Sequence, residues 1–291
     1  MSYMALAVTC YSDPGCPWAY SASPALAVLR WRYGAQLSWR LVTIGLTERR
    51  AQYERGYTPV RAARGYRAFR RYGMPFATQP RSRMMATARA CRTVVATRLR
   101  DPQRELEVFR ALQFAWFTTA LLLDEDSGLT AALERVDGLD VGAILAALDG
   151  EAVSVAYEAD RSEARSAEGG PTHFQGRAAQ TDGAVRYTAP SLIFEADGRR
   201  LEGGGFQPVE AYDVLVANLD TSLERREPPE DPLDALHALP AGLVTQEVAA
   251  VMAHNNEVPD HAAAEDALIE LAGDGRVRRV PMGDDALWRV E

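Results

Sequence analysis

The first fifty residues alternate between short apolar runs and a helical pattern. Residues 5–10 form a continuous apolar run that predicts a buried strand. Apolar side chains then recur at helical spacing from Pro17 to about Tyr33, and Gly34 supplies a stop signal. Residues 37–46 alternate between apolar and polar side chains, which predicts a second strand. A strand–helix–strand unit of this kind predicts two parallel strands in one sheet.

The middle of the chain has a helical pattern almost throughout, over residues 53–165. Ser82 is a potential N-cap for a helix that runs to about Leu99. Asp101 followed by Pro102 is a strong signal for the start of the next helix, because proline is well suited to the first helical position. The aromatic side chains of this region predict a helical core.

Strand signals return near residue 190. Residues 190–194 predict a strand that leads into a turn at 197–198, and residues 199–202 predict the strand that follows. Residues 209–219 then predict a closing helix. The charged, proline-rich segment 224–232 is the clearest domain boundary in the chain.

The last sixty residues have the pattern of a separate module. The predicted elements are three short helices, the second capped by Thr245, and a hairpin: residues 232–238, 245–254, 262–272, 276–280 and 286–290. Three helices and a hairpin resemble a winged-helix module. Its second and third helices are acidic, which disfavours contact with the phosphates of DNA. We therefore interpret it as a module for protein contacts.

Composition and charge narrow the class of protein. The chain has 291 residues, of which 47% are hydrophobic, and a net charge of −8, which disfavours a nucleic-acid partner. Neither an apolar segment of about 18 residues nor a secretory signal is present, so we expect a cytoplasmic protein with no membrane partner. Residues 30–110 are strongly basic, whereas residues 231–291 are acidic. We expect the acidic module to dock on the basic region or on a second protomer.

Three cysteines, Cys10, Cys16 and Cys91, make an odd count without the spacing of a metal site. No metal is expected, and reduced thiols fit this composition better than a disulfide framework. Cys10 lies at the end of a predicted core strand and Cys91 on an apolar helix face. Both are predicted to be buried, although Cys10 is also a potential second thiol for Cys16.

Cys16 has the sequence context of a reactive thiol. It follows the first strand and occupies the N-cap position of the first helix, with Pro17 at the first helical position. The amide hydrogens at a helix N-terminus stabilise a thiolate, so we expect the pKa of Cys16 to be lowered. Trp18 can restrict the access of water to the sulfur.

The segment Ser12-Asp13-Pro14-Gly15-Cys16-Pro17-Trp18 resembles the DsbA family of thioredoxin-like thiol oxidoreductases, in particular its FrnE-like branch. The family is related to 2-hydroxychromene-2-carboxylate isomerase, a glutathione-dependent enzyme. The resemblance covers about residues 4–220. It implies an α/β, thioredoxin-like fold with a large inserted helical domain. The small C-terminal winged-helix-like module lies beyond the resemblance and is expected from its own sequence pattern. The corresponding units are residues 1–50 with 170–222, 51–169, the linker 223–232, and 233–291.

The resemblance also implies a cis-proline loop opposite the cysteine. The segment Thr188-Ala189-Pro190 matches that loop in position. In the family, the backbone at this point pairs with a substrate that carries a thiol or disulfide. The residues expected to bind substrate are Ala19, Thr188, Ala189 and His173. His173 precedes the loop and is a candidate acid or base.

Ala19 departs from the family, which has its resolving cysteine at that position. Without a second thiol, a mixed disulfide on Cys16 needs an external thiol for release. Three explanations stay open. The protein is a single-thiol oxidoreductase of small-molecule or protein thiols, helped by glutathione or mycothiol; it is an isomerase or transferase that uses such a thiol; or Ala19 was introduced to trap mixed disulfides. A non-catalytic binding protein on the same scaffold is a further alternative.

Overall fold

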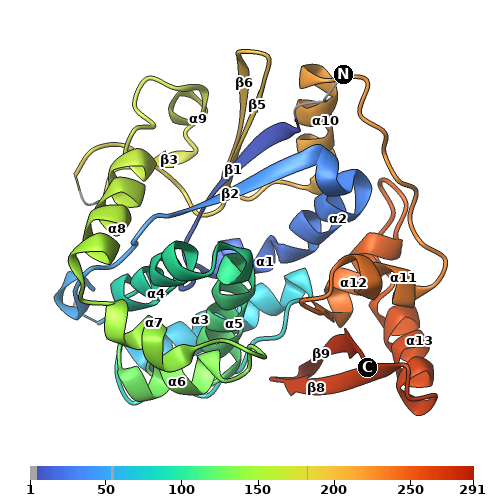
Figure 1. The fold of residues 1–291 in the computed structure, drawn as a ribbon, viewed down its shortest axis with the longest axis horizontal. Helices are drawn as coiled ribbons and strands as arrows, with labels where there is room; N and C mark the ends of the chain where they lie inside the picture. The colour runs from blue at the N-terminus through green and yellow to red at the C-terminus, as the bar shows by residue number, and fades with distance from the viewer. Residues whose placement is uncertain (1–4, 54–55, 182) are drawn as a thin grey trace.

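A four-stranded mixed sheet lies at the centre of the molecule, in the order β2–β1–β5–β6 (Figure 1). The computed structural model describes residues 5–53, 56–181 and 183–291. As predicted, β1 (Leu6–Ser12) pairs in parallel with β2 (Leu37–Thr43). On its other edge β1 pairs antiparallel with β5 (Ser191–Ala196), which pairs in turn with β6 (Arg199–Gly204). Strands from the beginning and from the later part of the first 220 residues therefore lie in one sheet.

The single helix predicted over residues 17–33 is in fact two helices. α1 (Pro17–Ser21) ends before Ala22, and α2 (Ser23–Tyr33) begins after it. Pro24 lies in the first turn of α2, and a proline has no amide hydrogen to continue the hydrogen bonding of the preceding turn. The prediction of one helix is wrong for this reason, and α1 is a short element of its own.

The helical region between β2 and β5 is close to the predicted one, with corrections at two helix starts. α4 begins at Ala88, so Ser82 is not its cap, and Thr87 at its start donates its hydroxyl to Asp13. A 3₁₀ turn, η4 (Pro102–Arg104), follows Asp101 before α5 begins. The main helices are α3 (Pro59–Phe69), α4 (Ala88–Arg100), α5 (Glu105–Thr118), α6 (Asp126–Leu133), α7 (Val141–Ala147) and α8 (Glu151–Ala164).

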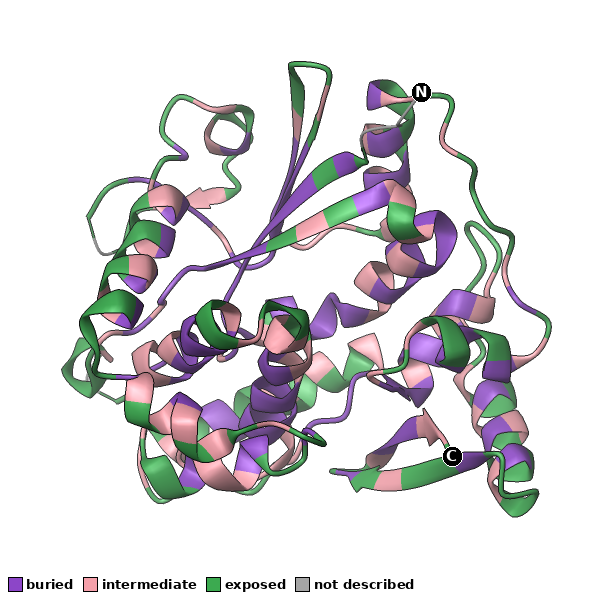
Figure 2. Cartoon of the chain, in the orientation of Figure 1, coloured by how far each residue is buried: buried purple, intermediate pink, exposed green. Residues whose placement is uncertain are grey.

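Shorter elements complete this part of the chain. α10 (Val209–Leu219) packs against β6 and α2. The remaining elements are η1 (Gly34–Gln36), η2 (Arg50–Gln52), η3 (Arg70–Tyr72), α9 (Pro171–Phe174), β3 (Ala178–Ala179) and β4 (Arg186–Tyr187). Apolar side chains of β1, β5, α4 and α5 belong to one continuous buried core. Figure 2 shows this burial along β1, with exposed residues on the outer faces of α8 and α13.

The C-terminal module contains the predicted helices and hairpin, and one strand that the sequence pattern did not predict. Its elements are α11 (Pro232–Ala238), β7 (Leu243–Val244), α12 (Thr245–Met252), α13 (His261–Gly273), β8 (Val277–Met282) and β9 (Asp285–Val290). The strands form a sheet in the order β7–β9–β8. Thr245 is not the cap of α12 but its first residue, because its hydroxyl accepts a hydrogen bond from Trp288 Nε1. The winged-helix label stays a prediction.

The C-terminal module packs against both other parts of the chain. Ala27, Val28 and Trp31 of α2 belong to the module's own apolar core. Arg110 of α5 forms a buried ion pair with Glu247 of α12, at 2.7 Å between Nη1 and Oε1. An acidic residue of the module thus meets a basic residue of the helical region, within the same chain.

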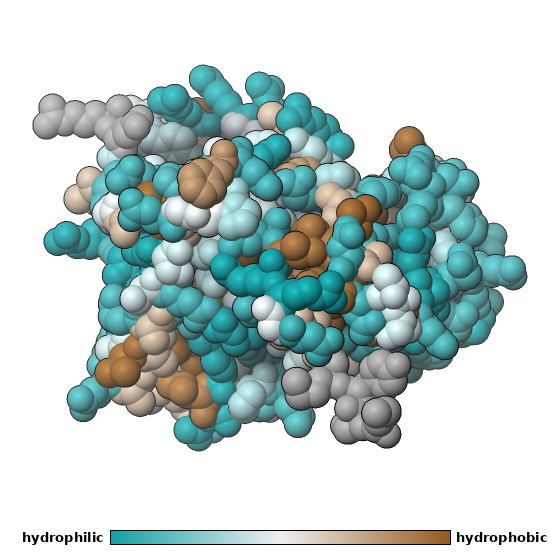
Figure 3. Space-filling view, turned by 90° about the horizontal axis from the view of Figure 1, so that it is seen from above, coloured by the Kyte–Doolittle hydropathy of each residue, from teal (hydrophilic) through white to brown (hydrophobic). Residues whose placement is uncertain are grey.

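The face seen from above the view of Figure 1 is hydrophilic over most of its area, with hydrophobic residues gathered in separate patches (Figure 3). Among the described residues, no helix combines the length and the apolar character that crossing a bilayer requires.

Candidate active site

Cys16 lies where β1 gives way to α1. Its amide donates to the carbonyl oxygen of Asp13 at 3.1 Å, which closes the turn after the strand. Cys16 has an extended backbone, with φ −89° and ψ 115°, and is the N-cap of α1. Pro17 occupies the first turn, where the missing amide hydrogen costs nothing. The sequence context therefore places the Cys16 sulfur at the N-terminal end of α1, as predicted.

The Cys16 thiol faces the loop that precedes β5. Its Sγ lies 3.1 Å from the Ala189 carbonyl oxygen and donates a hydrogen bond to it, across 173 residues of sequence. The peptide bond between Ala189 and Pro190 is cis. The Thr188 hydroxyl donates to the Arg177 carbonyl oxygen at 2.8 Å and ties this loop to the preceding segment. The fold thus brings Cys16 and the Thr188–Pro190 loop together.

Burial governs the ionisation of Cys16. The residue is 6% exposed, and desolvation raises the pKa of its thiol to about 12. The Ala19 amide lowers the pKa, and the charge of Asp13 raises it. The lowered pKa expected from the sequence is therefore wrong for the free protein. The amides at the helix N-terminus lower the pKa of Cys16, as expected, but the loss of water around the sulfur raises it by more.

We expect the alkylation rate of Cys16 by iodoacetamide to keep rising between pH 7 and about pH 11, by about tenfold per pH unit. Only the thiolate reacts, and an unperturbed thiol would level off above about pH 8.5. Intact mass spectrometry of a Cys10→Ala/Cys91→Ser variant, in which Cys16 is the sole thiol, measures this rate. A plateau below pH 9 would contradict the raised pKa. In the unfolded chain the Cys16 thiol ionises at about pH 8.5, whereas in the folded protein its pKa is raised to about 12. Burial of the neutral thiol therefore stabilises the fold fully below about pH 8.5, and this stabilisation is lost as the pH rises from there toward the folded pKa.

Trp18 and Ala19 occupy opposite environments on α1. Trp18 is 41% exposed and contacts three aromatic rings, those of Phe69, Tyr72 and Phe206, at centroid distances of 4.9, 5.8 and 5.6 Å. Ala19 is buried in the same apolar cluster as Cys16. Position 19 therefore faces the region where a second sulfur would have to lie, and it carries only a methyl group.

The other candidate residues form no hydrogen bond with the Cys16 sulfur in the described part of the chain. His173 is in α9, where its Nδ1 accepts a hydrogen bond from the Gly169 amide at 3.1 Å, and no hydrogen bond or ion pair joins it to Cys16 within the described ranges. Cys10 is free and buried in the main core, where burial raises its pKa to about 11. Cys91 is also free and buried. No group of three or more His, Cys, Asp or Glu side chains in the described part of the chain could hold a metal ion.

Asp13 is the site residue that the sequence analysis did not single out. Its carboxylate is fully buried and accepts hydrogen bonds from the amides of Gly15 and Leu46, each at 2.8 Å. It also accepts from the hydroxyl of Thr87 at 3.0 Å. Burial raises the pKa of this carboxyl. Asp13 therefore fastens the turn before Cys16 to the helical region, and the only sequence signal was an acidic residue directly after a buried strand.

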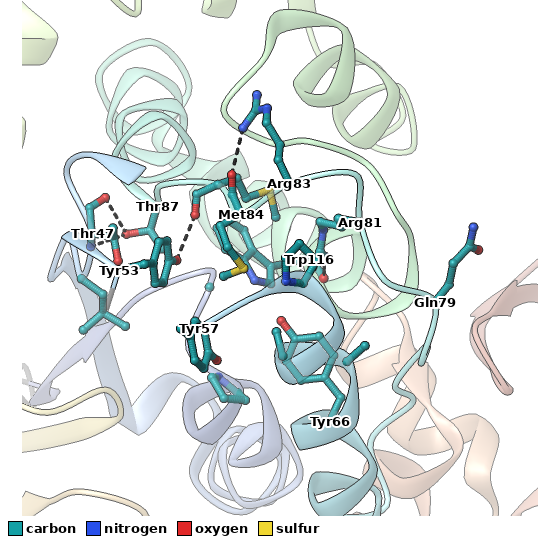
Figure 4. Close-up of a pocket in the computed structure, with 17 residues that line it drawn as sticks. Thr47, Tyr53, Tyr57, Tyr66, Gln79, Arg81, Arg83, Met84, Thr87 and Trp116 are labelled. Atoms are coloured by element: carbon teal, nitrogen blue, oxygen red, sulfur yellow. Dashed lines mark hydrogen bonds between the residues drawn. The ribbon is translucent and has the colours of Figure 1, made fainter. Parts of the chain in front are cut away.

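A cavity of about 160 Å³ lies on the other side of the motif, where Gly15 and Pro17 contribute to its wall. A Cβ atom at Gly15 would lie 2.6 Å from Thr87 Cγ2, so only glycine fits at that point. Aromatic side chains surround much of the cavity (Figure 4); they are Tyr53, Tyr57, Tyr66 and Trp116. The Cys16 sulfur points toward Ala189 and is not among the lining residues.

Comparison with known proteins places this geometry in a family. Residues 7–189 match the family model described as a DSBA-like thioredoxin domain. A candidate protein disulfide isomerase from Nitrosomonas europaea has a similar structure, with a TM-score of 0.54 and 19% identity over 74% of this chain and 97% of that one.

Two further solved structures are similar. The cytosolic disulfide reductase DsbM from Pseudomonas aeruginosa has a TM-score of 0.52 and 20% identity over 74% of this chain and 98% of that one. The probable DsbA oxidoreductase from Streptomyces coelicolor has a TM-score of 0.53 and 19% identity over 77% of this chain and 93% of that one. No curated protein matches the sequence. At these identities the structural likeness establishes a shared fold.

Proposed function

Because the chain belongs to the family of DSBA-like thioredoxin domains, we propose that it is a thiol–disulfide oxidoreductase that reacts through the single thiol of Cys16. The observation that carries this proposal is the contact between the Cys16 sulfur and the Ala189 carbonyl oxygen at 3.1 Å. This contact places the thiol at the start of α1 beside the loop that contains Pro190. Ala19 carries no thiol and Cys10 forms no disulfide, and both facts support a reaction that uses one protein thiol.

The proposed reaction has two exchange steps. The Cys16 thiolate attacks one sulfur of a substrate disulfide, forms a mixed disulfide with it, and displaces the other sulfur as a thiolate that takes up a proton. An external thiolate then attacks the substrate sulfur of the mixed disulfide. This second step releases a new disulfide and returns Cys16 as a thiolate, which is protonated again. These two steps exchange one disulfide for another. A second external thiolate then attacks the released disulfide and frees the remaining substrate thiol, so two electrons pass in total from two external thiols to the substrate disulfide.

Substrate docking supplies the activation that the free protein lacks. The neutral thiol is stabilised by its hydrogen bond to Ala189, and a carbonyl that accepts from a thiol favours the protonated form. A substrate segment that pairs with the backbone of Ala189 takes this acceptor away. The amides of Ala19 and Trp18 lower the pKa of Cys16, and once the hydrogen bond to Ala189 is gone the carbonyl no longer opposes this effect. Docking and deprotonation are linked in this scheme.

The external thiol is proposed to be glutathione or mycothiol, and the substrates to be disulfides of small molecules or proteins. A reducing, cytoplasmic compartment fits this scheme, because all three cysteines are free and buried. The similar protein from Pseudomonas aeruginosa is itself described as a cytosolic disulfide reductase.

Glutathione disulfide tests the proposed function directly. We expect incubation to give a single glutathione adduct on Cys16, detected by intact mass spectrometry and peptide mapping, and we expect reduced glutathione to remove it. Cys16→Ser should give no adduct, whereas Cys10→Ala should behave like the wild type. An adduct on Cys10 alone, or none on any thiol, would refute the proposed reaction.

A thiol-dependent isomerase or transferase is the second candidate, and the raised pKa of Cys16 favours it. A neutral thiol is a weak nucleophile, but it can still hydrogen-bond to a thiol cofactor. Calorimetry separates the two functions. Binding of reduced glutathione to the wild type without any mixed disulfide from glutathione disulfide supports the isomerase or transferase.

A further inference from the structure

The cavity beside Gly15 and Pro17 is open because α3 presents small side chains to it. Ala62 and Ala63 are buried and line the cavity, and a larger apolar side chain at either position would occupy the space. Its volume of about 160 Å³ is close to that of an apolar cavity of about 150 Å³ that is known to accept benzene. A ligand with a single six-membered ring therefore matches its size.

Aromatic rings surround this space on several sides (Figure 4). Tyr53 and Tyr57 stack on each other, with ring centroids 5.6 Å apart. Tyr66 of α3 packs edge-on against Phe117 of the core, at 5.4 Å. Trp116 of α5 also lines the cavity. Aromatic rings attract a further ring in offset-stacked or edge-to-face geometry, so this wall favours an aromatic ligand over an aliphatic one of equal size.

Two polar atoms of the wall are open to a ligand. Trp116 Nε1 and the Tyr66 hydroxyl have no hydrogen-bond partner among the residues that the structure describes, and neither atom is fully enclosed by protein. Figure 4 shows the Tyr66 hydroxyl on the side of the cavity that faces Trp116. An indole nitrogen only donates, whereas a phenol hydroxyl donates and accepts. A hydroxyl on the ligand can therefore satisfy both groups.

The two arginines of the wall already have partners. Arg81 donates to the carbonyl oxygen of Trp116 in the last turn of α5, where a positive charge is favourable. Arg83 forms ion pairs with Asp124 and Glu125. An anionic ligand would have to compete for these arginines, and burying its charge without a counter-charge is costly. The cavity therefore favours a neutral ligand.

We propose that this cavity is a binding site for a small neutral phenol with one ring. The ring lies between Tyr57, Tyr66 and Trp116, and its hydroxyl forms hydrogen bonds with Trp116 Nε1 and the Tyr66 hydroxyl. The site is separate from the Cys16 sulfur but adjoins the turn before it, because a Cβ atom at Gly15 would lie 2.8 Å from the Trp116 ring. Binding at this site does not depend on the proposed reaction of Cys16.

Phenol itself is the probe. We expect isothermal titration calorimetry to show one phenol bound per chain. Cyclohexanol should bind about tenfold more weakly, because it lacks the ring contacts. Benzoate should also bind at least about tenfold more weakly, because its charge has no free counter-charge in the cavity. Cys16→Ser should bind phenol like the wild type, which keeps this result independent of the thiol chemistry.

Two variants and their matched controls test the cavity. Ala63→Phe fills it and should abolish phenol binding, whereas Ala68→Phe, on the exposed face of the same helix, should bind like the wild type. Tyr66→Phe removes one neutral hydrogen bond and should weaken binding by about three- to tenfold. Tyr72→Phe, outside the cavity, is its control. Thermal unfolding of each variant shows whether its fold persists, and Tyr66→Phe tests the site even if Ala63→Phe does not fold.

Nuclear magnetic resonance locates the bound phenol. The chain has five tryptophans, each with one indole N–H signal, and the Trp116→Phe spectrum identifies the signal of Trp116. Phenol should shift this signal more than the other four. No phenol binding at millimolar concentration, equal binding of cyclohexanol or benzoate, unchanged binding by Tyr66→Phe, or an unshifted Trp116 signal would each overturn the proposal.

Discussion

Ala19→Cys is expected to shorten the lifetime of the mixed disulfide on Cys16 by about a thousandfold at micromolar external thiol, because a tethered thiol acts at millimolar or higher effective concentration. Positions 16 and 19 are three residues apart at the start of α1, and both lie in the same buried cluster. Side chains three apart share one helix face. A thiol at position 19 can therefore attack Cys16 and release the bound group.

Glutathione disulfide and intact mass spectrometry measure this effect. The wild type should keep its adduct after excess reagent is removed, whereas Ala19→Cys should lose it and end as an internal disulfide. Ala262→Cys, which places an extra thiol at an exposed position of α13, is the control and should keep the adduct on Cys16. If Ala19→Cys keeps the adduct as long as the wild type, the assignment of position 19 as the missing resolver is wrong.

Glu247→Ala is expected to lower the free energy of unfolding by about 3–5 kcal/mol, because it leaves a buried arginine without its counter-charge. The Glu247 side chain is fully buried and accepts from Arg110 through both carboxylate oxygens, at 2.7 and 2.8 Å. It also accepts from the amide of Val244 at 2.9 Å at the start of α12. The substitution therefore removes an ion pair and a helix cap together.

Urea unfolding followed by circular dichroism measures the loss. The double variant Arg110→Met/Glu247→Leu replaces both charges with apolar groups and should recover most of the lost stability. Asp266→Ala on the exposed face of α13 is the control and should stay within about 0.5 kcal/mol of the wild type. A loss below about 1 kcal/mol for Glu247→Ala would show that the module does not depend on this pair.

Local sequence signals predicted most of the elements, because each depends on residues close together in the chain. The apolar run before Asp13 predicted β1, and Cys16 followed by Pro17 predicted the start of α1. The starts of α4 and α12 were missed because the hydroxyls of Thr87 and Thr245 bond to residues distant in the sequence, Asp13 and Trp288. The resemblance of the motif to the DsbA family, rather than a local signal, marked position 19 as the place where a second thiol is missing.

The sequence by itself determined which thiol stands at the N-terminus of α1, which residue stands three positions later, and which family the motif resembles. All three depend only on neighbouring residues. Tertiary structure alone decided that Cys16 meets Ala189 and that Asp13 is buried. It also reversed the expected shift in the pKa of Cys16. Desolvation depends on everything packed around a side chain, and those neighbours come from segments far apart in the sequence.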